Sequence, residues 1–312
     1  MAKELKNRVI VIDGSMTIHK AQNVFHTLSA GDINTGIAYG FLRSLIKLIK
    51  TYAPCEMCVV FDNSMNVTDS FDHDVVSYRQ ELFPGYKADR GHDDKLLEGV
   101  RLLFRFLKTL PVTIIYPTQK YEADDLVSFV VRKAFEDHML NKMGKYEVIV
   151  VSDDKDFNQL ICKSNGFSVK LLKKNQKGKG DRLWDDDMFR SKFGFSPKMF
   201  IPYLALLGDK GDCIPGVYGY GRVKSAALVR DNKWNEISSK LTDEECAIFL
   251  RNITLIELES GVEVVSKIFQ PSLDKEKFNR LAKKYKMTSF LRKEDQEIIE
   301  NINKLSFLEG TK

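Results

Sequence analysis

The chain has 312 residues, of which 43% are hydrophobic and 29% are charged, a composition typical of a soluble protein with room for one large or two smaller domains. Its longest apolar runs are far too short to cross a bilayer and its first residues form no apolar signal segment, so we expect a cytoplasmic protein with no membrane association. The five cysteines form no disulfide framework, and the net charge of +5 is a weak indication of a polyanionic partner.

The first predicted elements alternate between strand and helix, and both strands lead to an aspartate. Residues 8–12 (RVIVI) form a continuous apolar run, typical of a strand that is buried on both faces, and Asp13 follows it. Apolar side chains then recur at helical spacing over residues 37–49. A second apolar strand, residues 56–61, is followed by Asp62.

A polar stretch without apolar periodicity covers residues 63–95, and regular structure resumes after it. The pattern predicts an amphipathic helix over residues 96–110 and a strand over residues 112–116. The next segment, YEADDL, begins another predicted helix and carries three carboxylates within four residues. They belong to Glu122, Asp124 and Asp125.

An acidic first turn is common in helices, because acids interact favourably with the helix dipole. Glu122 and Asp125, however, are three residues apart and share one helix face, whereas Asp124 is turned elsewhere. Carboxylates this close repel one another unless a cation lies among them. The sequence therefore predicts a cation near this helix start.

A fourth predicted strand, residues 147–151, runs into Asp154 and Asp156. Strands that alternate with helices indicate a mostly parallel sheet, and such sheets place their sites beyond the carboxyl ends of the strands. A single acid after a strand is usually a turn residue, but acids after four strands would meet at one edge. Oxygen ligands in this number favour magnesium or manganese. Two such ions could activate a water and stabilise the departing oxygen of a phosphodiester.

Two later segments could contact nucleic acid. A basic hairpin follows the predicted strand over residues 168–172, and it is either a solvated loop or a contact to a phosphate backbone. Residues 208–221 contain Asp209 and Asp212 and are then rich in glycine, before a helix predicted over residues 223–229. Glycines at a helix start let backbone amides approach a phosphate, although a flexible loop is the alternative.

Six motifs, in the same order, resemble those of the flap endonuclease or 5′-nuclease family, and most closely its phage-encoded members. The motifs are VIDG (11–14), FD (61–62), PGYKADR (84–90), YEADD (121–125), SDDKD (152–156) and the glycine-rich segment (208–221). The resemblance implies an α/β fold with a PIN-like, mostly parallel sheet flanked by helices. It implies a nuclease domain over residues 1–184 with a helical arch at about 63–95. A helical domain over residues 185–312 would contain a helix-three-turn-helix at about 200–232 that binds DNA.

The resemblance also implies the roles of individual residues. Near the arch, Lys87 and Arg90 would hold the scissile phosphate, with Asp62 and Asp154 as further catalytic residues, and Tyr86 would stack on a base. Metal ions would be bound, directly or through water, by nine acids: Asp13, Asp62, Glu122, Asp124, Asp125, Asp154, Asp156, Asp209 and Asp212. The helix-three-turn-helix would contact nucleic acid through Gly216, Gly219, Gly221 and Lys224. The implied cofactors are two magnesium ions, for which manganese can substitute, and a potassium ion at the helix-three-turn-helix.

Three positions depart from the family pattern. Cys213 stands where the family usually has asparagine, and Tyr220 stands where it has a small aliphatic residue. The lysine expected after Gly221 comes one residue late, at Lys224. These departures concern the grip on the phosphate backbone and the potassium ion, and they leave the acid set complete.

The sequence therefore predicts a hydrolase, a 5′-3′ exonuclease or flap endonuclease that uses two metal ions at 5′ flaps, nicks or RNA primers during DNA replication or repair. Its expected partners are branched or nicked duplex DNA or an RNA–DNA hybrid with a 5′ end, and a sliding clamp or single-strand-binding protein. We expect a monomer. Two other functions are open: a PIN-type endoribonuclease without junction specificity, and a non-catalytic junction-binding protein. The glycine-rich segment argues against the first, and the complete acid set argues against the second, because clustered carboxylates cost stability without a metal.

Overall fold

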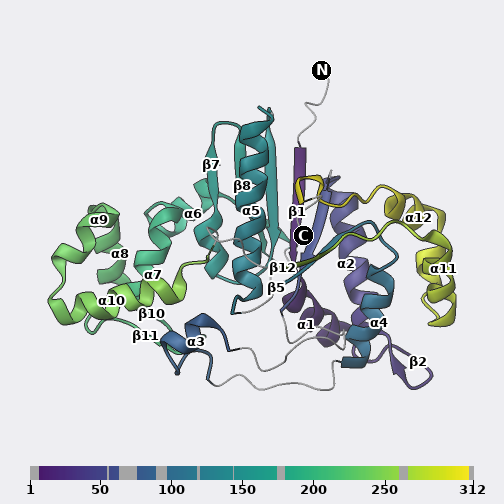
Figure 1. The fold of residues 1–312 in the computed structure, drawn as a ribbon, viewed down its shortest axis with the longest axis horizontal. Coiled ribbons are helices and arrows are strands. Elements are labelled where there is room, and N and C mark those ends of the chain that lie inside the picture. Colours follow the sequence, from purple (N-terminus) through teal and green to yellow (C-terminus); the bar gives the residue numbers. More distant parts are fainter. Residues whose placement is uncertain are drawn as a thin grey trace.

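The computed structural model describes residues 7–54, 56–62, 76–88, 97–117, 120–142, 144–173, 180–259 and 266–308. Among these residues, a central sheet of eight strands has the order β12-β5-β4-β1-β6-β8-β7, with β9 paired to β8 (Figure 1). Its strands are β1 (Asn7–Asp13), β4 (Glu56–Val60), β5 (Thr113–Pro117), β6 (Tyr146–Val151), β7 (Cys162–Ser164), β8 (Phe167–Lys173), β9 (Arg182–Trp184) and β12 (Ser266–Phe269). Two short pairs stand apart from it, β2 (Ser29–Ala30) with β3 (Ile33–Asn34), and β10 (Gly208–Asp209) with β11 (Ile214–Pro215).

The five neighbouring strands β5, β4, β1, β6 and β8 are parallel, which confirms the predicted mostly parallel sheet. The other three strands join it in antiparallel pairs. Strand β1 lies near the middle and is buried on both faces, as its apolar run predicts. Val9 and Val11 belong to the hydrophobic core on one side of the sheet, and Ile10 and Ile12 belong to the core on the other. This placement brings Asp13 to the centre of the carboxyl edge.

Helices cover both faces of the sheet. One core contains side chains of α1, α2, α4, α11 and α12, and the other contains side chains of α5 to α10. The helices are α1 (Gly14–Phe25), α2 (Gly36–Tyr52), α3 (Tyr78–Leu82), α4 (Leu97–Leu107), α5 (Ala123–Leu140), α6 (Asp186–Phe193), α7 (Phe200–Leu207), α8 (Arg222–Asp231), α9 (Trp234–Ile237), α10 (Asp243–Ile256), α11 (Lys275–Lys284) and α12 (Lys293–Glu300). Of the predicted arch, only residues 76–88 lie in the part of the chain that the structure describes, and they include α3.

The last part of the chain returns to the sheet, which the sequence does not predict. Strand β12 adds to the edge strand β5 in antiparallel register. Helices α11 and α12 then lie beside α2 and α4 (Figure 1), where Phe106 and Phe278 meet edge to face and Arg43 pairs with Asp295 at 2.6 Å. The residues predicted as one helical region, 185–312, are thus divided between the two sides of the sheet. Among the described residues, no helix is long and apolar enough to span a membrane.

Candidate metal centre and active site

Asp13 connects two neighbouring strands at the carboxyl edge of the sheet. It is the last residue of β1 and caps α1, where its Oδ1 accepts a hydrogen bond from the backbone N of Met16 at 2.9 Å. Its Oδ2 accepts a hydrogen bond from Oγ of Ser152, which follows β6, at 2.8 Å. The Ser152 hydroxyl also accepts from the backbone N of Asp154 at 3.0 Å. Ser152 therefore orients both the first aspartate and the loop that carries Asp154.

Asp62, which follows β4, is tied to the start of α5. Its Oδ1 accepts a hydrogen bond from the backbone N of Ala123 at 3.2 Å, and its own backbone N donates to Oγ of Ser15 at 3.3 Å. The residue after Ala123 is Asp124, so the strand end and the acidic helix start are held side by side.

The pKa values indicate that these acids share one buried site. The pKa of Asp13 is raised to about 6, mainly by burial, and the charges of Asp62 and Asp154 contribute to the shift. Burial also raises the pKa of Asp124 well above its usual range, with Asp154, Asp13 and Asp62 adding to the effect and Lys87 opposing it. Asp124, which the sequence places away from Glu122 and Asp125, is therefore the member of the YEADDL motif that joins the other strand ends.

Three further acids form an adjacent group. Asp156, Asp209 and Asp212 each offer a carboxylate oxygen that lies within 4.8 Å of the other two. The pKa of Asp156 is raised to about 8, mainly by burial, and the charges of Asp154, Asp209 and Asp212 contribute to the shift. Asp154 thus acts on Asp13 and Asp124 in one group and on Asp156 in the other. The two groups are continuous through Asp154.

This donor set fits divalent metal ions. The Oδ1 atom of Asp156 is buried and has no hydrogen-bond partner among the described residues, which is costly unless a cation or water meets it. Lys155 pairs with Asp209. The raised pKa values on both sides of Asp154 mean that nearby positive charge does not offset burial and repulsion among these carboxylates. A set of ligands that are all oxygens suits hard cations such as magnesium.

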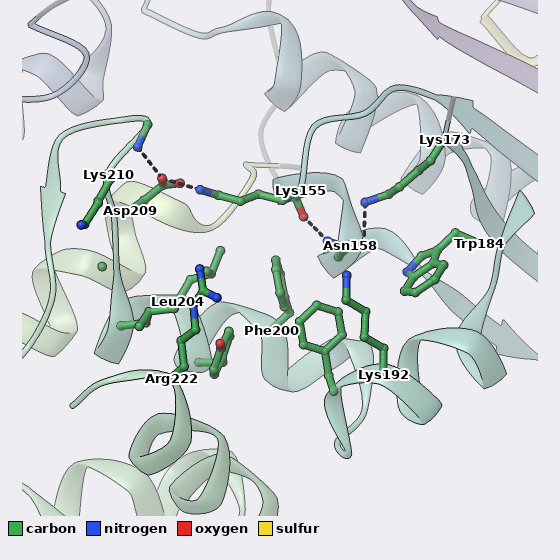
Figure 2. Close-up of a pocket in the computed structure, with 15 residues that line it drawn as sticks. Lys155, Asn158, Lys173, Trp184, Lys192, Phe200, Leu204, Asp209, Lys210 and Arg222 are labelled. Atoms are coloured by element: carbon green, nitrogen blue, oxygen red, sulfur yellow. Dashed lines mark hydrogen bonds and ion pairs between the residues drawn. The ribbon is translucent and has the colours of Figure 1, made fainter. Parts of the chain in front are cut away.

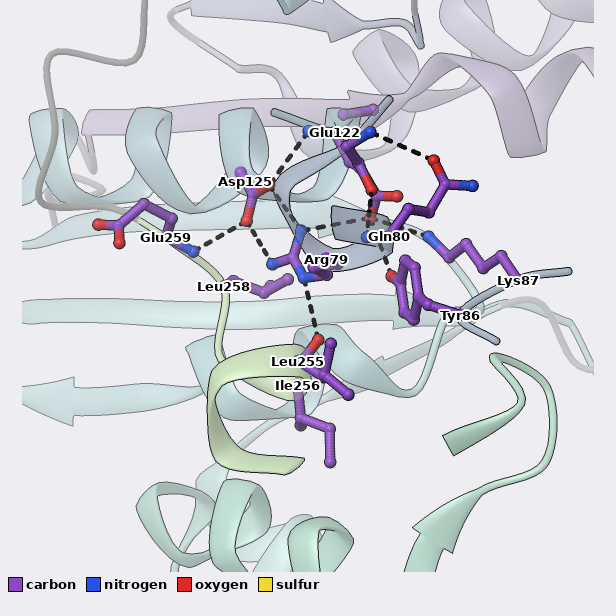
Figure 3. Close-up of polar contacts among 12 residues, drawn as sticks. Arg79, Gln80, Tyr86, Lys87, Glu122, Asp125, Leu255, Ile256, Leu258 and Glu259 are labelled. Carbon is purple, nitrogen blue, oxygen red and sulfur yellow. Dashed lines mark hydrogen bonds and ion pairs between the residues drawn. The ribbon is translucent and has the colours of Figure 1, made fainter. Parts of the chain in front are cut away.

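Glu122 and Asp125 do surround a cation, but it is the guanidinium of Arg79 (Figure 3). Arg79 is only 1% exposed and donates to Asp125 twice, to Glu122, and to the carbonyls of Leu255 and Glu257. These five hydrogen bonds use every N–H of a guanidinium. The sequence does not identify Arg79, because it lies in the stretch predicted as the polar arch.

The carboxylate of Asp125 is fully used by hydrogen bonds within the protein. Its two oxygens accept four hydrogen bonds, two from Arg79 and one each from the backbone N of Glu122 and of Glu259. A carboxylate has about four acceptor positions, so none is left for a metal ion or its water. Asp125 is fully buried and holds Arg79 in place.

Glu122 is held by three donors at the base of the arch. Its Oε2 accepts from Nζ of Lys87 at 2.9 Å, from the hydroxyl of Tyr86 at 2.9 Å and from Arg79 at 3.3 Å. Burial raises the pKa of Glu122, but Lys87 and Arg79 outweigh burial and hold the pKa below its usual value. Tyr86 is 3% exposed, so its ring packs in the core and is not presented for the predicted base stacking. Arg90 lies outside the described residues.

The glycine-rich segment forms a tight hairpin between α7 and α8. A side chain at Gly216 would meet the carbonyl oxygen of Leu207 at 2.4 Å, so the close approach of the two backbones requires glycine there. Gly219, with φ +79°, and Gly221 have open space around them at the start of α8. Lys224 is exposed, and its Nζ lies 3.8 Å above the ring of Tyr220. The predicted contact residues of this segment therefore lie together on one exposed turn, apart from Gly216, which lies where the two backbones pack closely.

Comparisons with known proteins agree with this geometry. A family model described as the 5′-3′ exonuclease, N-terminal resolvase-like domain, matches residues 8–194. The chain is 29% identical over 227 residues to a 5′-3′ exonuclease of Buchnera aphidicola subsp. Schizaphis graminum, covering 72% of this chain and 70% of that protein. It is 28% identical over 307 residues to DNA polymerase I of Bacillus caldotenax, covering 93% of this chain but only 32% of the polymerase.

The fold is similar to that of the bacteriophage T5 flap endonuclease, solved as a pseudo-enzyme–product complex with DNA and metal ions. That structure has a TM-score of 0.57 and 17% sequence identity, and the match covers 94% of this chain and 99% of the other. At this identity the likeness concerns the fold. It agrees with the parallel sheet and its flanking helices.

Proposed function

The chain belongs to the 5′-3′ exonuclease family, and from this membership we propose that it is a metal-dependent 5′-nuclease that hydrolyses phosphodiesters at 5′ flaps, nicks or RNA primers. The observation that carries the proposal is the continuity of the buried acids through Asp154. Buried carboxylates that are not matched by positive charge reduce the stability of the folded protein. A reaction that needs bound cations explains why the protein has them.

Magnesium is the proposed ion, with manganese as a substitute, because the donors are all oxygens. Two ions would be held, directly or through water, by Asp13, Asp62, Asp124, Asp154, Asp156, Asp209 and Asp212, with Glu122 at the edge of the site. When bound, they would activate a water and stabilise the departing oxygen.

Lys87 is proposed to hold the scissile phosphate, together with Arg90. The Nζ of Lys87 is held by Glu122, its backbone N donates to the carbonyl of Asp212 at 3.1 Å, and its charge acts on buried Asp124. It therefore lies between the arch and the acids. Its φ of +53° is unusual for a lysine, which supports a conformation fixed by its surroundings.

Duplex DNA is proposed to bind along α7, the hairpin and α8, as a helix-three-turn-helix within a helical domain that begins near residue 185. The open turn at Gly219 and Gly221 and the N-terminus of α8 would meet backbone phosphates, and Lys224 would add a charge contact. The proposal includes a potassium ion at this turn and an RNA–DNA hybrid as a further substrate. It also includes a sliding clamp or single-strand-binding protein as a partner, a monomeric state and a cytoplasmic location.

A labelled 5′-flap duplex tests this function directly. We expect cleavage near the junction in magnesium, none in chelator, and much slower cleavage of a plain single-stranded RNA of the same sequence. Cleavage of both substrates at equal rates would favour the endoribonuclease instead. Tight junction binding without cleavage in any divalent metal would favour the binding protein.

A further inference from the structure

A cavity of about 680 Å³ opens beside the acid cluster, between the sheet and the helices that follow it (Figure 2). Its wall includes the ends of β8 and β9, helices α6 and α7, and the first residue of α8. It also includes Asp209 and Lys155, so it is continuous with the proposed metal site. Its volume lies in the range of sites that bind small molecules.

The cavity is strongly cationic. Its wall contains the cationic residues Lys155, Lys173, Lys192, Lys210 and Arg222, and Asp209 is its only acid. Asp209 already pairs with Lys155. Asp153, Asp154 and Asp156 act on Lys173 from beyond the wall, but among the described residues Lys173, Lys192, Lys210 and Arg222 form no ion pair. An anion is the ligand that would pair with them.

Two of these amines converge on one point. Nζ of Lys173 donates to Oδ1 of Asn158 at 3.2 Å, and Figure 2 shows Nζ of Lys192 directed to the same place. The pKa of Lys173 is lowered to about 8, mainly by burial and also by the charge of Lys192, although Asp154, Asp153 and Asp156 oppose the shift. Like charges brought this close are stabilised by an anion that accepts from both. A phosphate group, with several acceptor oxygens, has the required chemistry.

The same cavity has an aromatic wall. Trp184, which is half-buried, lines it beside the buried rings of Phe200 and Tyr203, and Figure 2 shows the indole nitrogen of Trp184 on the side that faces Lys192. This Nε1 atom is buried and has no acceptor among the described residues. An aromatic surface beside a phosphate site suits a nucleobase. Any of the bases can stack on such a surface, and a base can also supply an acceptor to the indole N–H.

We propose that this cavity binds one nucleotide of the cleaved strand, adjacent to the scissile phosphodiester, with its phosphate between Lys173 and Lys192 and its base beside Trp184. The assignment of the strand rests on the proposed nuclease function. The binding of a nucleotide rests on the cavity alone. The subsite would fix the register of the strand relative to the acids.

Tryptophan fluorescence tests nucleotide binding without any cleavage. The chain has two tryptophans, so Trp234→Phe leaves Trp184 as the only emitter. In chelator, we expect thymidine 5′-monophosphate to change its emission saturably, at concentrations at which thymidine and inorganic phosphate change it much less. Adding Lys173→Gln and Lys192→Gln should weaken binding on the order of tenfold or more, because two charged donors are lost.

The matched control is Lys133→Gln with Lys275→Gln, which removes the same charge from lysines whose partners are the surface acids Glu136 and Glu300. It should bind the nucleotide as the parent does. No saturable change in the parent, or equal loss in both double variants, would overturn the nucleotide site. Because no metal is present, the result is independent of whether the protein proves to be a nuclease.

Cleavage kinetics then test the location on the strand. An abasic residue next to the scissile phosphodiester of a 5′ flap should raise the KM of the unmodified protein on the order of tenfold, which corresponds to one lost base stack. It should add little to the already raised KM of the Lys173→Gln, Lys192→Gln variant, because both changes remove the same contact. Independent, multiplying effects would overturn the location, whereas an inactive unmodified protein with intact nucleotide binding would contradict the proposed function instead.

Discussion

Arg79 and Asp125 form a buried two-point ion pair, in which Nη2 of Arg79 lies 2.6 Å from Oδ1 of Asp125 and Nη1 lies 2.8 Å from Oδ2. The pair joins α3 to the start of α5, and Arg79 also donates to carbonyls at the end of α10 and just beyond it. Three segments distant in the sequence are therefore locked together directly behind Glu122. The metal site depends on this contact for the position of its helix start.

Replacing Arg79 should be strongly destabilising. Arg79→Met leaves Asp125 buried without its partner, and breaking a buried pair in this way costs about 3–5 kcal/mol. Chemical denaturation at neutral pH measures the loss. Lys120→Met is the control, because its ion pair with Glu81 is exposed on both sides (55% and 48%) and should contribute less than about 1 kcal/mol. Equal losses for the two variants would contradict the structural role of Arg79.

Lys87→Ala should reduce turnover on a 5′ flap by about 10²–10³-fold, as expected for the loss of a cation that stabilises developing negative charge. The pKa of Glu122 should also rise, because Lys87 no longer opposes the effect of burial and only Arg79 and Tyr86 still do. Lys133→Ala, on the surface of α5, controls for the loss of a positive charge and should turn over at the normal rate. If Lys87→Ala also turns over at the normal rate while the acid variants are inactive, the phosphate is not held by Lys87.

Metal binding should strengthen as the pH rises from 6 to 9. In the metal-free protein the pKa of Asp13 is about 6 and that of Asp156 is about 8, so at pH 6 Asp13 is partly protonated and Asp156 is mostly protonated, and an ion must displace these protons. Calorimetry in buffers of different ionisation enthalpy should detect proton release near pH 7, and less release near pH 9. Affinity that is independent of pH across this range would exclude these carboxyls as ligands.

The same pKa shift predicts the stability of the metal-free protein. Since the folded pKa of Asp156 is about 8, above the usual 3.8, the folded state binds the extra proton, and stability from this group falls as pH rises between those values. Asp156→Asn removes the ionisation, so it should raise the melting temperature in chelator at pH 8 and have a smaller effect at pH 5. A greater stabilisation at pH 5 would contradict the buried, shifted carboxyl.

Duplex binding should weaken steeply with salt, because basic side chains displace condensed counterions from the DNA backbone. Lys224 is exposed at the start of α8, and Lys224→Ala should reduce the slope of log K against log salt by about one contact. Lys275→Ala, on α11, is the control and should leave the slope unchanged. An unchanged slope for Lys224→Ala would mean that the lysine stays on Tyr220 when DNA binds.

The parallel strands and the acids at their ends could be predicted because both signals are local. Continuous apolar runs identify β1, β4, β5 and β6, and parallel strands must bring Asp13, Asp62 and Asp154 to one edge. The role of Asp125 could not be predicted in this way. Its partner Arg79 lies 46 positions away, in a stretch without apolar periodicity.

The return of the chain to the sheet at β12 could not be predicted from the sequence either. Strand β12 is four residues long and follows a region of helices, so no alternating pattern marks it. Its place is set by pairing with β5 and by the packing of Phe278 on Phe106. The cavity beside Asp209 likewise depends on residues spread between positions 155 and 222 that only the fold brings together.

Cleavage by Asp154→Asn, compared with Asp153→Asn, tests the central claim most directly. Asp154 acts on both groups of acids, whereas Asp153 pairs with Lys20 at 2.6 Å. On a 5′ flap in magnesium we predict that Asp154→Asn loses cleavage and that Asp153→Asn keeps most of it. In chelator, Asp154→Asn should bind the flap at least as tightly as the unmodified protein, because one carboxylate that repels phosphate is gone. Unchanged cleavage by Asp154→Asn would contradict the proposed metal-dependent nuclease site.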